Sequence, residues 1–341
     1  MLRRPFMLGV VGSAAALLAP PVRAQGGEQM RISLDTNPTH VRNRNTEAFA
    51  QRVRAELPKL APQVFPSAQL FRDRDVPRAL RQGGVEMGIP GWWNLDGIAP
   101  DAALPSLPMF YGLEPSILHR IMDGPAGQQI NRKLEERLRV KVLGRWFDLG
   151  AQHFYSTSKP LNGYADLQNL RIRHPGGSAN AARIRTLGAN PVLVPWPDVP
   201  LALSQNTVDG LTTTHESANT AKLWDAGVRY SFEDFQTFNQ YIPMVSQTLW
   251  NKLNAQERET LTRLWEEAVD KERAEAATAQ REARDILLRN NITIKTASRE
   301  EAADARRRLM ATQDQLVAEI GIDRDLVAGV LREIRAAGVA V

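Results

Sequence analysis

The chain has no cysteine among its 341 residues, which excludes disulfide bonds, thiolate nucleophiles and thiolate metal sites. It also lacks HExxH, G-x-S-x-G, Walker and G-x-G-x-x-G motifs, which mark several classes of hydrolase and nucleotide-binding enzyme. None of the five histidines has a second histidine four positions later. We therefore expect no catalytic residue, no metal and no cofactor, although missing motifs alone do not close the case against an enzyme.

Beyond residue 24 no stretch reaches the roughly 18 uninterrupted apolar residues of a membrane helix. The first 24 residues differ from the rest: Arg3 and Arg4 precede an apolar run, Phe6–Ala19, and small residues occupy the −3 and −1 positions before a cleavage site after Ala24. This layout is typical of a secretory signal peptide. The arginine pair also fits a twin-arginine signal, so the export route stays open. We expect a soluble protein in the periplasm that begins at Gln25.

The chain carries little excess charge. Its formal charge of +5 falls to +2 once Arg3, Arg4 and Arg23 are removed with the signal peptide. Such a balance gives no reason to expect a nucleic-acid partner. A composition of 43% hydrophobic and 24% charged residues is ordinary globular material, and the length suits one large domain or two of medium size. We expect a monomer.

Apolar periodicity predicts strands that alternate with helices in the first third. Residues 30–34, 62–66 and 85–93 are predicted strands, and helices are predicted from Thr46 to Leu57 and over 75–84. Strand–helix–strand alternation favours parallel pairing, so the fold class is α/β.

The same alternation returns later, with strands expected over 140–147, 153–161, 170–175, 190–195 and 208–214. A capping-box pattern at Asn254 and Glu257 then opens a helical stretch that lasts to Asn290, about 50 Å at 1.5 Å per residue. A helix of this length can bridge two domains. Ser298 opens a further helix in the same way.

Several binding-type side chains stand at predicted strand ends. Arg173 can hold a carboxylate through two parallel N–H···O bonds, but a lone arginine more often forms a surface or interdomain salt bridge. Trp92, Trp93 and Trp196 are candidates for a pocket wall, with core packing as the commoner alternative. Thr213 offers a hydroxyl at a strand end, or simply reflects the strand preference of β-branched residues.

Seven segments occur in an order and spacing that resemble one family. They are VFPSAQLFRD, ALRQGGVEMG, LPSLPMFY, KVLGRWFDLGAQHFYSTSKPL, DLQNLRIRHP, RTLGANPVLVP and LALSQNTVDG. Together they are similar to the extracytoplasmic solute receptors of TRAP (tripartite ATP-independent periplasmic) transporters, whose members include C4-dicarboxylate receptors. The resemblance covers residues 30–253, and the long helix that follows fits it as well.

The resemblance implies a periplasmic binding protein fold with two discontinuous α/β lobes, connecting strands and a long bridging helix. It places residues 25–149 and 239–278 in lobe I, and residues 150–238 and 279–341 in lobe II. It also implies a function: capture of a small carboxylate-bearing organic acid and its delivery to the membrane-embedded TRAP permease subunits.

The resemblance further implies a set of ligand-binding residues. Arg173 takes the position of the family's hallmark arginine, which pairs with the ligand carboxylate. Other matching positions carry less weight: they are Asp35, Trp92, Trp93, Gln152, Trp196 and Thr213. Gln152 stands near the place of a second family arginine, and Thr213 stands in a Thr212–Thr213 pair where the family has Glu-Asn. Losing the second arginine and adding tryptophans suggests a ligand with one carboxylate and an apolar or aromatic body.

Two other function classes stay open beside the transport receptor. One is an exported enzyme on a two-lobed fold. The other is a receptor that presents its ligand to a sensor or to another type of importer. Fold alone does not separate these, because similar folds carry different functions. A ligand returned unchanged after incubation argues against the enzyme.

Overall fold

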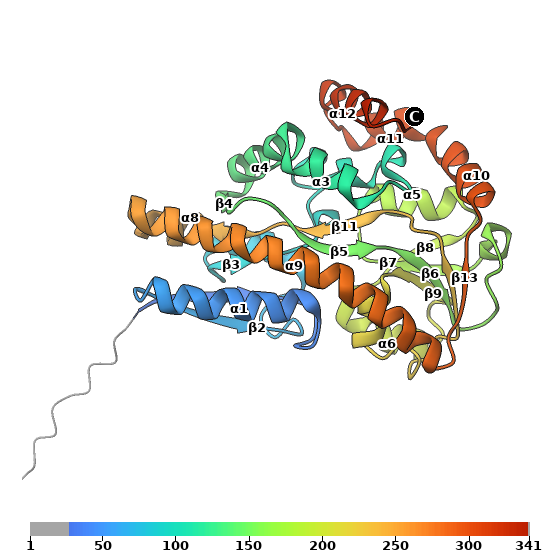
Figure 1. Cartoon of the computed structure of the whole chain (residues 1–341), viewed down its shortest axis with the longest axis horizontal. Helices are drawn as coiled ribbons and strands as arrows, with labels where there is room; N and C mark the ends of the chain where they lie inside the picture. Colours follow the sequence, from blue (N-terminus) through green and yellow to red (C-terminus); the bar gives the residue numbers. More distant parts are fainter. Residues whose placement is uncertain (1–26, 340–341) are drawn as a thin grey trace, which may run out of the picture.

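A computed structural model describes residues 27–339 of the chain, so the expected signal peptide lies outside the described residues. Two β-sheets organise the described part into two lobes (Figure 1). The sheet of lobe I has the order β2-β1-β3-β12-β4. Its strands are β1 (Glu28–Ser33), β2 (Leu60–Phe65), β3 (Met87–Gly88), β4 (Val140–Val142) and β12 (Met244–Ser246). β1 pairs in parallel with β2 and β3, as the alternating pattern predicts, and β12 runs antiparallel to β3 and β4.

The sheet of lobe II has the order β13-β10-β6-β9-β7-β8. Its strands are β6 (His153–Ser156), β7 (Arg171–His174), β8 (Asn190–Leu193), β9 (Gly210–Thr213), β10 (Tyr230–Glu233) and β13 (Thr293–Thr296). β7 lies between β8 and β9 and is parallel to both. The carboxyl ends of these three strands therefore meet at one edge, the place where α/β sheets bind ligands.

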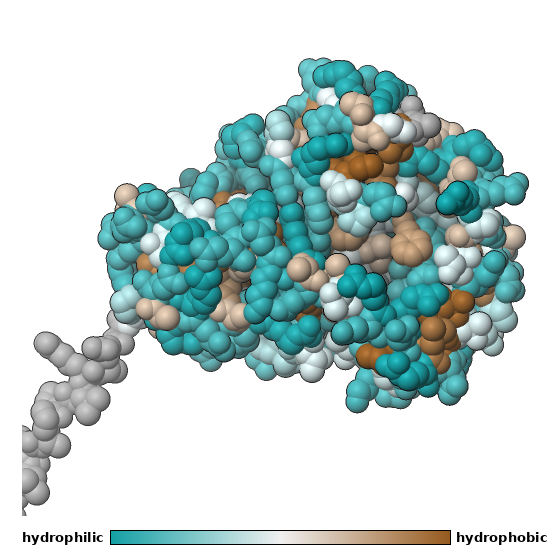
Figure 2. Space-filling view, in the orientation of Figure 1, coloured by the Kyte–Doolittle hydropathy of each residue, from teal (hydrophilic) through white to brown (hydrophobic). Residues whose placement is uncertain are grey.

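Helices cover both sheets. In lobe I they are α1 (Val41–Glu56), α2 (Val76–Gln82), α3 (Pro115–Asp123), α4 (Pro125–Leu138) and α8 (Gln247–Lys252). In lobe II they are α5 (Ser178–Thr186), α6 (Val199–Ser204), α7 (His215–Thr220) and α10 (Arg299–Met310). No described helix has the length and apolar character that a membrane crossing demands. The face seen in Figure 2 is mostly hydrophilic, with small apolar areas among the polar side chains.

Two elements join the lobes. The first is a ribbon of β5 (Phe147–Ala151) and β11 (Phe238–Tyr241), paired antiparallel with a bulge at Asn239 and Gln240. The second is α9 (Ala255–Arg289), a helix of 35 residues that packs on α1 in lobe I and on α7 in lobe II. In Figure 1 it crosses the molecule from lobe I on the left to lobe II at the lower right. The predicted bridging helix and the two-lobed α/β class are thus confirmed.

The expected elements differ from the observed ones mainly at their ends. The first helix begins at Val41 rather than Thr46, because the His40 ring caps it by accepting a hydrogen bond from the Arg42 backbone N–H. The strand expected over 85–93 is ordered as a strand only at Met87–Gly88, and the chain then turns into a short 3₁₀ helix at Trp92–Asn94.

The last two helices, α11 (Gln313–Ile320) and α12 (Arg324–Ala336), pack with lobe I. Leu316, Val327 and Ile334 belong to the same apolar cluster as Met30 of β1. By contrast, Leu309 of α10 belongs to a cluster of lobe II. This packing differs from the expectation that all of residues 279–341 accompany lobe II. The lobe boundaries themselves stay a prediction.

Candidate functional site

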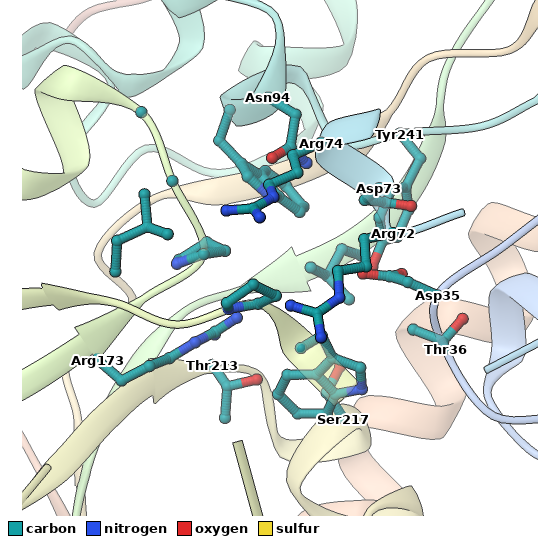
Figure 3. A pocket seen from close by; sticks show the side chains of 18 of the residues that line it. Asp35, Thr36, Arg72, Asp73, Arg74, Asn94, Arg173, Thr213, Ser217 and Tyr241 are labelled. Atoms are coloured by element: carbon teal, nitrogen blue, oxygen red, sulfur yellow. The ribbon is translucent and has the colours of Figure 1, made fainter. Parts of the chain in front are cut away.

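A cavity of about 250 Å³ lies between the two lobes. Arg173, Trp196 and Thr213 line it from lobe II. Asp35 and Trp93 line it from lobe I, and Tyr241 of the ribbon closes one side. In Figure 3, Arg173 and Thr213 stand on one side of this space, and Asp35, Asp73 and Tyr241 stand on the other. A small molecule in this cavity would contact both lobes at once.

Arg173 is the buried cation of the cavity. It stands near the end of β7, its residue is 2% exposed, and its side chain extends toward the cavity in Figure 3. Its Nε donates to the Val194 carbonyl (2.8 Å) and its Nη1 to the Thr212 carbonyl (3.4 Å). Within residues 27–339 no carboxylate oxygen lies within 4.0 Å of it. Burial lowers the pKa of this guanidinium to about 10, and the charge of Asp35 opposes that shift only in part.

The neighbours of Arg173 hold its side chain in place but do not neutralise its charge. The two carbonyl acceptors belong to chain segments on either side of β7, and the Trp196 ring faces the guanidinium at 5.4 Å. A buried guanidinium held by neutral groups is a costly arrangement unless an anion reaches it. The site is therefore built to accept a small anion, and the planar fork suits a carboxylate.

The structure brings together six of the seven residues that the sequence suggested. Those at the cavity are Arg173, Gln152, Trp196, Thr213, Trp93 and Asp35. The exception is Trp92, which is 1% exposed and packs edge-on against the Trp93 ring at a centroid distance of 5.4 Å. Neighbouring residues of a tight helical turn point in different directions, so only one of the two tryptophans reaches the cavity. Trp92 belongs to the core of lobe I.

A cluster of Asp35, Arg42 and Asp73, here termed the acid pole, forms part of the lobe I side. The sequence interpretation named Asp35 but missed Arg42 and Asp73. Arg42 is 0% exposed and contacts both carboxylates, the second at 3.4 Å. Its Nη1 also donates to the Ile89 carbonyl at 3.0 Å. Asp73 accepts a hydrogen bond from the Gly91 N–H at 3.2 Å. The only signal was the FRD end of the first quoted segment, which contains Asp73 but shows nothing of Arg42.

Contacts across the cavity mouth join the lobes. Arg72 of lobe I pairs with Asp198 of lobe II at 2.8 Å, and Asp96 of lobe I accepts the Ser178 N–H at 2.8 Å. Gly177, with φ of 83°, brings the loop after β7 so close to Trp93 that a Cβ there would lie 3.4 Å from the Trp93 Cβ. The lobes are thus in contact around the cavity.

Gln152 lines the cavity and is positioned from behind by a second buried arginine. Arg183 of α5 donates to the Gln152 side-chain oxygen (3.2 Å) and to that of Gln236 (3.1 Å). Burial lowers the Arg183 pKa to about 10. Arg183 does not line the cavity, so here the glutamine presents the polar group that faces it. The RIR spacing within α5 gave no hint of this role.

Asp234 lies in the same buried network and accepts a hydrogen bond from the Tyr111 hydroxyl at 3.0 Å. Burial raises its pKa to about 7, against the hydrogen bonds of Gln236 and Tyr111 and the charge of Arg183. An unfolded aspartate titrates near pH 4. Between about pH 4 and 7 the folded state therefore holds a proton that the unfolded state has lost, and the stability from Asp234 falls as pH rises through this window.

We expect Asp234→Asn to remove this pH dependence, because the amide stays neutral at every pH. The melting temperature of the variant minus that of the native protein should rise by at least about 2 °C from pH 5 to pH 8. Thermal melts at both pH values measure it. Asp225→Asn is the control, since Asp225 is exposed and should show no such change. A flat difference for Asp234→Asn contradicts the raised pKa.

A second cavity, of about 740 Å³, lies on the other side of the ribbon. Leu149 of β5 lines the first cavity, whereas Asp148 and Gly150 line the second. Within the described chain, one group of side chains has the spacing to hold a metal ion: His153, His215 and Glu233, whose ligand atoms lie within 4.8 Å of one another. Each of the three already has a polar partner, and the His153 Nδ1 accepts the Phe235 N–H at 3.3 Å. His215 bonds Glu233 at 2.9 Å, and Arg284 pairs with Glu233 at 2.9 Å. We read them as a structural network.

Residues 32–319 match the family model described as bacterial extracellular solute-binding protein, family 7. A solute-binding protein of Chromohalobacter salexigens is 24% identical over 238 residues, 70% of each chain. The 2,3-diketo-L-gulonate-binding periplasmic protein of Escherichia coli is 27% identical over 199 residues, which span 57% of this chain and 59% of that one.

Solved structures share the fold at low identity. The sugar acid binding protein of Advenella mimigardefordensis, in complex with galactonate, has a TM-score of 0.86 and 19% identity, covering 91% of this chain and 99% of that one. A TRAP periplasmic solute binding protein of Sulfurospirillum deleyianum, with bound succinate, has a TM-score of 0.81 and 24% identity, covering 89% and 98%.

Proposed function

The chain belongs to family 7 of the bacterial extracellular solute-binding proteins, and on that premise we propose that it is a periplasmic receptor for a small organic acid. The family consists of receptors rather than enzymes. The ligand carries a carboxylate, enters the cavity between the lobes and is delivered to a TRAP-type membrane permease. The receptor acts as a monomer, needs no cofactor and has no nucleic-acid partner.

The observation that carries this proposal is the buried Arg173 in a cavity between two lobes. Its guanidinium is 2% exposed and pairs with no carboxylate of the described residues. Taking such a cation out of water costs several kcal/mol unless an anion compensates it. A ligand carboxylate supplies that compensation through two charge-assisted hydrogen bonds. The ligand is thereby tied to lobe II.

The ligand also has to contact lobe I. It shifts an opening and closing equilibrium only by as much as it binds one state better than the other. Asp35 and Trp93 on lobe I face Arg173 and Trp196 on lobe II across the cavity, so the closed state offers contacts that the open state lacks. The β5–β11 ribbon and α9 connect the lobes, and we assign the hinge motion to them.

The proposed permease and compartment rest on relatives. Several matched proteins are named periplasmic, among them the C4-dicarboxylate-binding protein of Rhodobacter capsulatus. Solved relatives with a TM-score above 0.8 are described as TRAP periplasmic solute binding proteins. The expected signal peptide over residues 1–24 agrees with the same compartment.

Closure on binding is the expected result that tests the proposal. Native mass spectrometry of the purified protein identifies a retained acid, and small-angle scattering then compares the dialysed protein with the protein saturated by that acid. We expect a smaller radius of gyration on saturation, because closure brings two lobes together. An unchanged radius at saturation contradicts the hinge, and an acid that comes back chemically altered contradicts the receptor.

A further inference from the structure

The geometry points to a hydroxylated monocarboxylate as the ligand: its carboxylate meets Arg173, its far end donates hydroxyl hydrogen bonds to the acid pole, and a second carboxylate there is excluded. This inference rests on the proposed function, because it takes the Arg173 end as the carboxylate site. What it adds is the chemistry of the opposite end.

The acid pole turns oxygen atoms, not cationic groups, toward the cavity. Asp35 and Asp73 both line the cavity, whereas Arg42, which lies between them, does not. Arg42 is fully buried and its N–H groups are directed to Asp35, Asp73, the Thr36 hydroxyl and the Ile89 carbonyl. The Arg42 guanidinium is already paired with both carboxylates. A ligand that reaches this side therefore meets carboxylate oxygens, which accept hydrogen bonds.

The charge balance of the pole disfavours a further anion. Two carboxylates share the single cation Arg42. Burial and the neighbouring charge of Asp35 raise the Asp73 pKa to about 7, which is the behaviour of two acids too close to be ionised together. A ligand carboxylate would bring a further negative charge beside a pair that already resists holding two, whereas a hydroxyl donates to a carboxylate and adds no charge.

Neutral polar groups stand between the two ends, beside the apolar surfaces of Trp93, Leu149 and Trp196. Thr36, Asn94, Thr213 and Ser217 all line the cavity, and in Figure 3 Asn94, Thr213 and Ser217 lie around the space between Arg173 and Asp35. Hydroxyl and amide groups of this kind both donate and accept, which suits a chain of hydroxyl groups. This differs from the apolar or aromatic body expected from the tryptophans.

Two more arginines line the cavity, and they are the rival site for a second carboxylate. Arg72 is already paired with Asp198 at 2.8 Å. Arg74 has a side chain that is 54% exposed, and its nearest carboxylate, that of Asp75, lies at 3.9 Å. An anion at such an exposed cation gains little, because water screens the pair. For a second ligand carboxylate, repulsion by the buried acid pole is therefore stronger than attraction by Arg74.

Matched acids that differ only at the far end test the inference by calorimetric titration. Galactonate, galactarate and 6-deoxygalactonate end in a hydroxymethyl, a carboxylate and a methyl group; threonate, tartrate and 4-deoxythreonate repeat the series on four carbons. In the series that fits the cavity, we expect the hydroxyl member to bind at least about 10-fold tighter than the methyl member. We expect it to bind at least about 30-fold tighter than the dicarboxylate.

Asp35→Asn should lower the preference for the hydroxyl member over the dicarboxylate at least about 10-fold, since it removes a negative charge from the pole. Asp225→Asn makes the same change at an exposed site outside the cavity lining and should leave the preference intact. Asp35→Asn removes a partner of Arg42. If the variant therefore does not fold, the ranking of the acids on the native protein still tests the inference.

Three outcomes overturn the inference. The first is a dicarboxylate that binds as tightly as its hydroxyl counterpart or more tightly, and the second is a preference that Asp35→Asn leaves unchanged. The third outcome is that neither series binds while benzoate or butanoate binds in an Arg173-dependent way, which leaves the proposed function standing. If no acid of any kind binds, the proposed function falls together with the inference.

Discussion

Arg173→Ala is expected to weaken binding of the native organic acid by roughly 2–5 kcal/mol, or about 30-fold to several thousand-fold in dissociation constant. The variant leaves the ligand carboxylate buried without its charged partner. Arg173→Lys keeps the charge but loses the planar fork, so its affinity should lie between those of the native protein and the alanine variant. Calorimetric titration of the three proteins measures both effects.

Arg171→Ala is the matched control. Arg171 stands two residues earlier on the same strand, but its side chain is 45% exposed and pairs with Asp209 at 2.8 Å. Arg171 does not line the cavity, so its replacement should change affinity less than about threefold, or ~0.7 kcal/mol. Thermal melts without ligand check that each variant folds. If Arg173→Ala behaves like Arg171→Ala, Arg173 is not the carboxylate anchor.

Trp265→Ala is expected to lower the free energy of unfolding by about 3–5 kcal/mol, as truncation of a fully buried tryptophan does. Trp265 is 0% exposed. It stacks on Phe147 of the ribbon at 4.2 Å and meets Phe49 of α1 edge-on at 5.3 Å. Its Nε1 donates to the Arg145 carbonyl at 2.8 Å. One side chain thus connects α9, α1 and the ribbon.

Two companion variants test separately how much the Trp265 hydrogen bond and the buried position of the ring contribute to stability. Trp265→Phe keeps an aromatic ring and loses the hydrogen bond, so we expect a smaller loss, about 1–2 kcal/mol. Trp250→Ala removes a tryptophan that is only partly buried and faces Arg258 at 5.4 Å, and it should cost less than Trp265→Ala. Urea unfolding followed by circular dichroism gives all three values. Equal losses for Trp250→Ala and Trp265→Ala would show that the stacked ring is not special.

Short sequence patterns correctly predicted the helices and strands whose formation depends on neighbouring residues in the chain. The capping boxes at Asn254 and Ser298 are present, and each opens the helix expected there. Apolar alternation correctly placed the strand that carries Arg173. It failed near Trp92, where the chain leaves the strand at Gly88 and its direction is then set by packing in lobe I. A periodicity argument has no information about such packing.

The candidate site was predictable around Arg173, whereas two of the three residues of the acid pole, Arg42 and Asp73, had no signal that assigned them to it. Arg173 lies near the end of a recognisable strand, which made it a candidate, and the family resemblance then implied its role at the ligand carboxylate. The acid pole joins Asp73 to Arg42, 31 positions earlier in the chain, and only the folded lobe brings them together. Arg183 likewise acts through Gln152, a contact between residues 31 positions apart. Neither pair has a signal in a short window of sequence.

The packing of α11 and α12 on lobe I has a consequence for the order in which the protein can be completed. The apolar cluster of lobe I contains Met30, from the first strand, and Ile334, from the last helix. A growing chain is made from its N-terminus, so this core gains Ile334 only after the elements of lobe II, the last of which is α10, have been made. Lobe I is begun before lobe II and completed after it. A chain that stops before α12 would leave α3 without the contacts that α12 makes with it.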